Sequence, residues 1–115
     1  MPSTAQPSLF DRPSASASPE EVLLYALGEF QARGHKLADR EMALDRLRHA
    51  VDRACSRLRV ETADDETIAL MLEKIGARVV HIPDYFAKRP YRVTVPSALA
   101  SRAVTVYHQI NGKLS

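Results

Sequence analysis

Residues 64–96 read DDETIALMLEKIGARVVHIPDYFAKRPYRVTVP, and this stretch contains a helical pattern that passes directly into two strand-like runs. Asp64 or Thr62 can cap the helix, and Gly76 can end it. Carboxylates in its first turn meet the positive end of the helix dipole. The helix is expected to face the core through Ile68, Met71, Leu72 and Ile75.

The two strand-like runs lie at 78–82 and 91–95 and are rich in β-branched residues. The segment between them opens with the turn residues Pro83 and Asp84 and is too short for a parallel crossover. We therefore expect an antiparallel hairpin at about 78–95.

Two helices are predicted before this unit. Ser18, Pro19 and Glu21 form a capping-box signature, which predicts a helix from Pro19 to about Arg33, with Gly34 as its stop and Gly28 as a weak point in its interior. Asp39 is expected to cap a second, longer helix. That helix carries a heptad-like seam at Leu44, Leu47, Val51 and Leu58.

The seam has two interpretations. It can pack against the first helix inside the same domain, or it can meet a helix of a second subunit in a homodimer. Cys55 borders the seam and is expected to be a small buried apolar residue rather than a nucleophile.

The predicted fold class is α+β in the order α-α-α-β-β-α, a helical pair followed by a helix, a β-hairpin and a C-terminal helix. Ser97 can cap the last helix, and Asn111-Gly112 can end it. Residues 19–115 are expected to form one domain. Residues 1–18, rich in serine and proline, are expected to be a disordered tail.

Residues 64–96 resemble, in topology and in the basic tip, the recognition helix and wing of winged-helix proteins. The resemblance implies that helix 64–75 would enter a DNA major groove while Lys88 and Arg89 touch the adjacent backbone. However, residues 61–75 hold five carboxylates and one lysine, which would repel phosphates. The charge layout therefore favours protein contacts, including head-to-tail contact between the acidic face at 61–66 and the basic segment at 88–92.

The hairpin loop is the first candidate binding site, because it sets cations among aromatic rings. Alternatively, its rings close the core beneath the hairpin and its cations are solvated. The candidate residues are Tyr85, Phe86, Lys88, Arg89, Tyr91 and Arg92.

A second candidate lies in the tail. Gln6-Pro7-Ser8-Leu9-Phe10 resembles the short peptide by which many bacterial replication and repair proteins bind the sliding clamp, and Pro7 is the departure from that pattern. The resemblance implies that Gln6, Ser8, Leu9 and Phe10 contact a partner. The alternative is that Leu9 and Phe10 fold back onto the domain.

Catalytic and cofactor signals are weak. The chain has four glycines and no glycine-rich phosphate loop, which argues against a nucleotide-dependent enzyme. Acidic residues 64–66, and the helical set Asp45, His49 and Asp52, could be metal ligands, but a helix-dipole role and a solvated face are the preferred interpretations. We expect no catalytic residue, metal or cofactor; a small hydrolase using His49 or His81 is the enzymatic alternative.

A single cysteine and an N-terminus without an apolar leader are consistent with the cytoplasm. The mean hydropathy is −0.24, and no apolar run reaches the ~20 residues of a membrane span. The predicted function is a non-enzymatic adaptor that binds protein partners or itself. The alternative is a nucleic-acid-binding protein, associated with replication or repair, that adds the arginines of the second helix at Arg46, Arg53 and Arg57.

Overall fold

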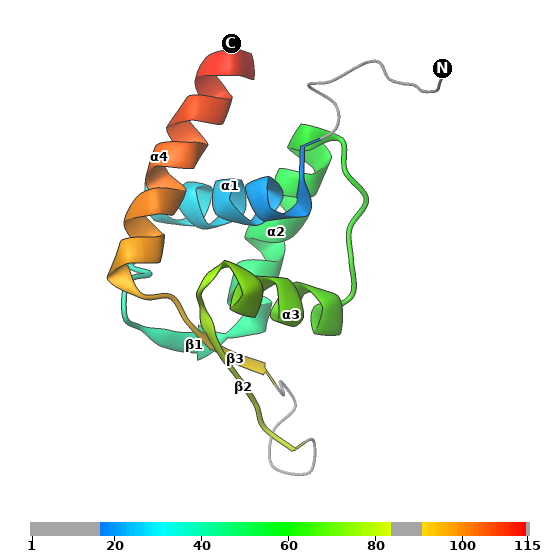
Figure 1. Cartoon of the computed structure of the whole chain (residues 1–115), viewed down its shortest axis with the longest axis vertical. Helices are drawn as coiled ribbons and strands as arrows, with labels where there is room; N and C mark the ends of the chain where they lie inside the picture. Colours follow the sequence, from blue (N-terminus) through cyan, green and yellow to red (C-terminus); the bar gives the residue numbers. More distant parts are fainter. Residues whose placement is uncertain (1–16, 84–90, 115) are drawn as a thin grey trace.

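The computed structural model describes residues 17–83 and 91–114 (Figure 1). This part of the chain is α+β and helix-rich, and its helices and hairpin follow the predicted order. The tail peptide Gln6–Phe10 and the loop residues 85–90 lie outside the described residues. The elements are α1 (Pro19–Ala32), β1 (Glu41–Ala43), α2 (Leu44–Leu58), α3 (Asp65–Ile75), β2 (Arg78–His81), β3 (Tyr91–Thr94) and α4 (Ser97–Leu114).

The predicted boundaries of α1 and α3 are confirmed by their caps. The Ser18 hydroxyl accepts from the Glu21 amide at 3.2 Å, while the Glu21 carboxylate accepts from the Ser18 amide at 2.9 Å. Asp64 caps α3 by accepting from the Thr67 amide at 2.9 Å. Gly76 ends that helix with φ of 118°, a left-handed conformation that favours glycine.

The predicted start of the second helix is wrong. Asp39 does not cap a helix, because its φ is +59° and its amide donates to the Val95 carbonyl at 2.7 Å. Residues 41–43 then form β1, and α2 begins at Leu44. The strand is favoured because Met42 alone of the three residues turns into the core, opposite the buried Val93.

The strands form one antiparallel sheet in the order β1-β3-β2. The predicted hairpin is the β2–β3 pair, with Val79 opposite Val93 and His81 opposite Tyr91. Because side chains alternate across a strand, these four residues share the inner face of the sheet. Val80 and Arg92, which are also opposite each other, share the outer face.

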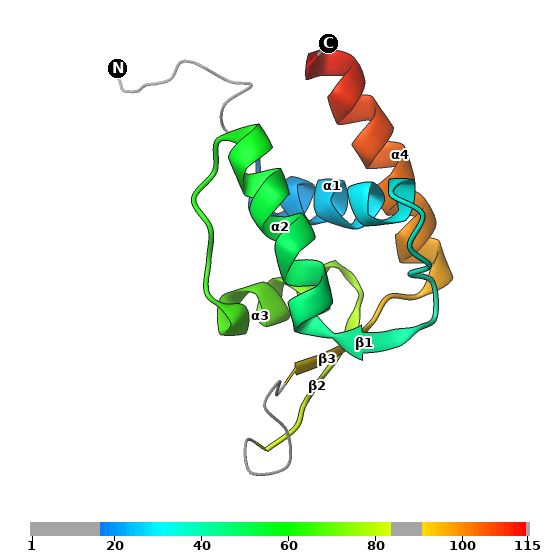
Figure 2. The same ribbon diagram turned by 180° about the vertical axis from the view of Figure 1, so that it is seen from behind.

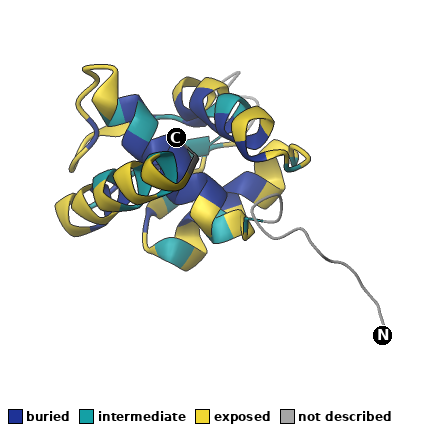
Figure 3. Ribbon diagram, turned by 90° about the horizontal axis from the view of Figure 1, so that it is seen from above, coloured by how far each residue is buried: buried dark blue, intermediate teal, exposed yellow. Residues whose placement is uncertain are grey.

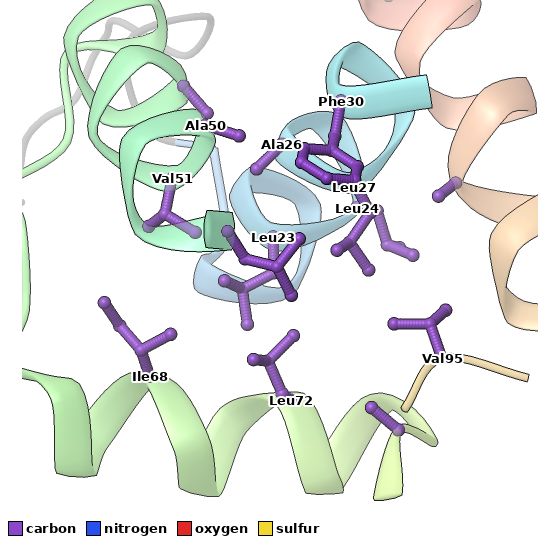
Figure 4. Packing of buried hydrophobic residues seen from close by; sticks show 14 of the residues in the cluster. Leu23, Leu24, Ala26, Leu27, Phe30, Ala50, Val51, Ile68, Leu72 and Val95 are labelled. Atoms are coloured by element: carbon purple, nitrogen blue, oxygen red, sulfur yellow. The ribbon is translucent and has the colours of Figure 1, made fainter. Parts of the chain in front are cut away.

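The core lies around α1, which α2, α3 and α4 surround (Figures 1 and 4). The seam of α2 is buried inside the single chain. It therefore packs within its own domain, as one of the two interpretations predicts, and the alternative that it forms an oligomer interface is wrong. Leu44, Leu47, Val51 and Leu58 are each at most 3% exposed. In Figure 3 the exposed residues cover the outer sides of the helices.

Gly28 lets α1 and α4 approach closely. A Cβ atom built on Gly28 would lie 2.4 Å from the Tyr107 Cβ and 2.5 Å from the Ala103 carbonyl oxygen. What the sequence indicated as a weak point is therefore a requirement of the helix crossing. The crossing is also tied by the Tyr25 hydroxyl, which donates to the Asn111 Oδ1 at 2.8 Å.

The predicted end of α4 at Asn111-Gly112 is also wrong, because the helix continues to Leu114. The last turns are anchored by Ile110, which packs against the core, and by the bond between Tyr25 and Asn111. Gly112 consequently stays helical. Among the described helices, none has the length and apolar character needed to cross a bilayer.

Candidate functional site

The structure separates the two described members of the predicted loop site. Tyr91 is on the inner face of the sheet, where its ring centroid lies 5.0 Å from that of His81. Arg92 is on the outer face, and its guanidinium lies 3.7 Å from the Glu41 carboxylate of β1. Tyr85, Phe86, Lys88 and Arg89 lie outside the described residues. Tyr91 and Arg92 therefore belong to two different surfaces.

The inner surface borders a groove between α3 and the hairpin. Its volume is about 360 Å³, and we call it the α3–hairpin groove. Residues of α3 at helical spacing form one wall, and the inner face of β2 and β3 forms the other. The lining residues are Glu66, Ala69, Leu70, Glu73, Val79, His81 and Tyr91.

The groove exposes apolar surface. Leu70 is 61% exposed, although it lies on a helix whose other large apolar residues are buried or half-buried. Buried Ala69 and half-buried Val79 extend the apolar surface, and the His81 and Tyr91 rings border it. A leucine this exposed beside a hollow is typical of a contact surface.

The carboxylates of α3 have separate roles. Asp64 caps the helix, and accepting hydrogen bonds from Thr67 holds the pKa of its carboxyl below its usual range. Asp65 accepts from Arg48 of α2 at 2.9 Å. Glu66 and Glu73 are exposed at the groove, and no cation of the described residues pairs with either.

The single lysine of α3 does not offset this charge. Lys74 turns toward α1, where its Nζ lies 3.9 Å from the Glu20 carboxylate. In a winged-helix-like arrangement, α3 is the element that would meet the phosphates of a duplex. Its exposed surface here combines Leu70 with Glu66 and Glu73, which would repel phosphates rather than neutralise them.

The arginines proposed for nucleic-acid contact do not form one open basic patch. Arg53 donates to Glu29 of α1 at 2.8 Å. Arg46 lies over the Phe30 ring, with its guanidinium carbon 6.0 Å from the ring centroid. Arg57 is exposed near the C-terminal end of α2. The three side chains are thus distributed over the surface of α2.

The candidate metal ligands Asp45, His49 and Asp52 do not converge on one site. Asp52 accepts from Arg48 at 3.2 Å, and Asp45 and His49 line a separate polar hollow beside Arg92. No group of three or more His, Cys, Asp or Glu side chains suited to a metal ion occurs within residues 17–83 and 91–114. Cys55 is buried, and burial together with the nearby Asp52 carboxylate raises the pKa of its thiol.

Comparison of the chain with protein-family models, with curated protein sequences and with solved structures gave no match in any of the three. Sequence reasoning missed Leu70, Glu73 and Val79 as site residues and considered His81 only as a catalytic alternative. One signal was present, since Glu66, Leu70 and Glu73 share a helix face that excludes the predicted core residues.

Proposed function

We propose that the protein is a non-enzymatic interaction module that binds a protein segment in the α3–hairpin groove. The segment presents apolar side chains to Leu70 and Val79 and places lysine or arginine beside Glu66 and Glu73. The observation that carries this proposal is the exposed Leu70 between two carboxylates on α3. Apolar contact supplies affinity, and the charges supply orientation and partner choice.

The geometry suits a short peptide rather than a small cofactor. The groove is open along α3, with an apolar floor at Ala69 and carboxylates at two positions seven residues apart. Seven residues of helix span about 10 Å, which matches two cations separated by two turns on a partner helix. An amphipathic helix with lysines on that spacing is therefore the partner chemistry that fits best.

A direct test uses a fluorescent amphipathic peptide of leucine and lysine and measures its anisotropy as the full chain is added. We expect binding that weakens with salt, because the carboxylates are exposed. The double variant Glu66→Lys, Glu73→Lys should lose binding. The control Glu20→Lys, Glu41→Lys changes the net charge equally at the half-buried Glu20 and the exposed Glu41, which both lie outside the groove, and should retain binding. Equal binding by both double variants would refute the proposal.

The bound segment could also come from a second copy of the chain, whose basic segment 88–92 would bind beside the carboxylates of the α3–hairpin groove. Light scattering at low and high salt tests it. A dimer that dissociates as salt rises supports this form, and a salt-insensitive oligomer contradicts it.

The clamp-like peptide Gln6–Phe10 is a separate proposal. Its test is whether the double variant Leu9→Ala, Phe10→Ala loses binding to a purified sliding clamp, and binding that survives contradicts it.

The nucleic-acid alternative has its best support in the sequence of the loop, where Lys88 and Arg89 precede Arg92. If it holds, the full chain is retained on a heparin or DNA column, and reversing these three charges abolishes retention. Retention that survives the triple reversal contradicts this mode of binding. If the protein is instead an adaptor, the wild-type chain itself should be retained only weakly, because the exposed face of α3 is acidic.

A further inference from the structure

The opposite side of α3 borders a second, more apolar pocket. Its volume is about 210 Å³, and we call it the α1–α2–α3 pocket because all three helices line it. In Figure 4, Leu23, Val51 and Ile68 point toward one another from these helices. Among the described residues, the lining is Pro19, Val22, Leu23, Val51, Cys55, Val60, Glu61, Ala63, Thr67, Ile68 and Met71.

The pocket has room for an aromatic ring. An engineered apolar cavity of about 150 Å³ in another protein takes up benzene, so about 210 Å³ accommodates a phenyl group with its methylene. Its wall between α2 and α3 is the extended linker at 60–64, which runs along the outside of the molecule (Figure 2). Val60 and Ala63 of this linker face the pocket.

The N-terminal segment begins at the wall of this pocket. Pro19 lines it, and residues 1–16, which the structure does not describe, continue from there. Leu9 and Phe10 are two adjacent large apolar residues in that segment. Phe10 lies seven positions before Ala17, the first described residue, and seven residues can span roughly 24 Å, so Phe10 can reach the pocket.

The charges at the pocket and in the N-terminal segment are also complementary. Glu61 is the one charged side chain among the described lining residues, and Arg12 is the one lysine or arginine in residues 1–16. Arg12 lies two residues after Phe10, which is close enough to meet Glu61 at the rim when the ring is inside. A short tether also gives the segment a local concentration in roughly the millimolar range, so weak intrinsic affinity suffices.

We propose that Leu9 and Phe10 of the same chain dock into the α1–α2–α3 pocket, with the Phe10 ring beside Cys55 and Arg12 beside Glu61. This intramolecular site is independent of the α3–hairpin groove, which uses other residues of α3. Docking withdraws Leu9 and Phe10 from any external partner. The peptide is thus available only when the pocket releases it.

Cys55 makes the proposal measurable, because it is the only cysteine of the chain and lines the pocket. The experiment follows the reaction of the full chain with Ellman's reagent under native conditions. Replacing both Leu9 and Phe10 by alanine should speed modification of Cys55 about tenfold, because burial of a phenylalanine side chain contributes at least that factor. Thr4→Ala, in the same segment, should leave the rate unchanged. Equal rates in all three proteins would overturn the proposal.

A second measurement separates docking from a general loosening of the fold. A synthetic peptide of residues 4–14, added at millimolar concentration to the double variant, should restore slow modification, and the same peptide with alanine at 9 and 10 should not. Failure of the native peptide to protect Cys55 would overturn the proposal. The wild-type rate should be independent of protein concentration, whereas protection that grows with concentration would assign the pocket to the segment of a second copy.

Discussion

Gly28→Ala should destabilise the protein, although alanine is the better helix former. The new methyl group would lie 2.4 Å from the Tyr107 Cβ and 2.5 Å from the Ala103 carbonyl oxygen, where carbon atoms normally keep about 3.5–4.0 Å. Neither neighbour can rotate away, because one is a backbone atom and the other is a Cβ. The helices α1 and α4 must therefore move apart by about 1 Å or more.

The magnitude follows from two opposing contributions. Overpacking of a tight contact costs about 1–3 kcal/mol, whereas replacing a helical glycine by alanine gains about 1 kcal/mol. Because both clashing atoms are rigid, the overpacking cost lies in the upper part of that range, at about 2–3 kcal/mol. We therefore expect a net loss of about 1–2 kcal/mol in the free energy of unfolding, measured by urea titration followed by circular dichroism.

Gly112→Ala is the matched control for this prediction. Gly112 also lies inside a helix, but nothing lies within 4 Å of the position its Cβ would take. This variant should gain about 0.5–1 kcal/mol. A Gly28→Ala protein as stable as wild type, or more stable, would refute the close crossing of α1 and α4.

Three further predictions concern ionisable side chains. Asp64→Ala should lower the melting temperature at pH 7, and this effect should shrink as the pH is lowered, because hydrogen bonds from Thr67 lower the pKa of Asp64 in the folded state and their stabilisation is lost once the carboxyl is protonated. An effect independent of pH would contradict the cap. The alkylation rate of Cys55 should reach its plateau at a higher pH than the rate of a free cysteine, because burial and the Asp52 carboxylate raise the pKa of the thiol. Asp52→Asn should lower the pH of the plateau, and an unchanged pH profile would contradict the contribution of Asp52. Glu29→Gln should cost about 1 kcal/mol in urea titrations through the loss of its ion pair with Arg53, and a neutral effect would mean that the pair is open in solution.

Much of the fold could be predicted because local signals and burial agree. The capping box at Ser18, the cap at Asp64 and the stop at Gly76 each depend on a few adjacent residues, and each appears in the structure. The two strands of the hairpin were recognisable because their β-branched residues flank a short connection with a turn signal.

The errors occurred where a distant contact overrides a local pattern. Residues 41–43 continue a helical register in sequence, yet β3 supplies hydrogen-bonding partners for a strand there. Gly112 resembles a helix stop, but the anchoring of Asn111 to Tyr25, 86 positions earlier, keeps α4 helical beyond it. Such contacts have no local signature.

The candidate groove could be predicted only in part. The acidic character of α3 is evident from composition, and Tyr91 was a predicted site residue. The opposite directions of Tyr91 and Arg92 follow from strand alternation, but the pairing of Tyr91 with His81 depends on the hairpin register. The exposure of Leu70 depends on which side of α3 packs against α1, and that is a property of the assembled core.

The most direct test of the central claim maps binding onto the backbone amides of the full chain by NMR. The leucine–lysine peptide and a mixed-sequence DNA duplex are titrated separately at the same ionic strength. We predict that the peptide shifts the amides of Glu66, Leu70, Glu73 and Val79, and that the duplex leaves α3 unchanged. Shifts of α3 amides with DNA, and none with the peptide, would contradict the assignment of this groove to protein binding.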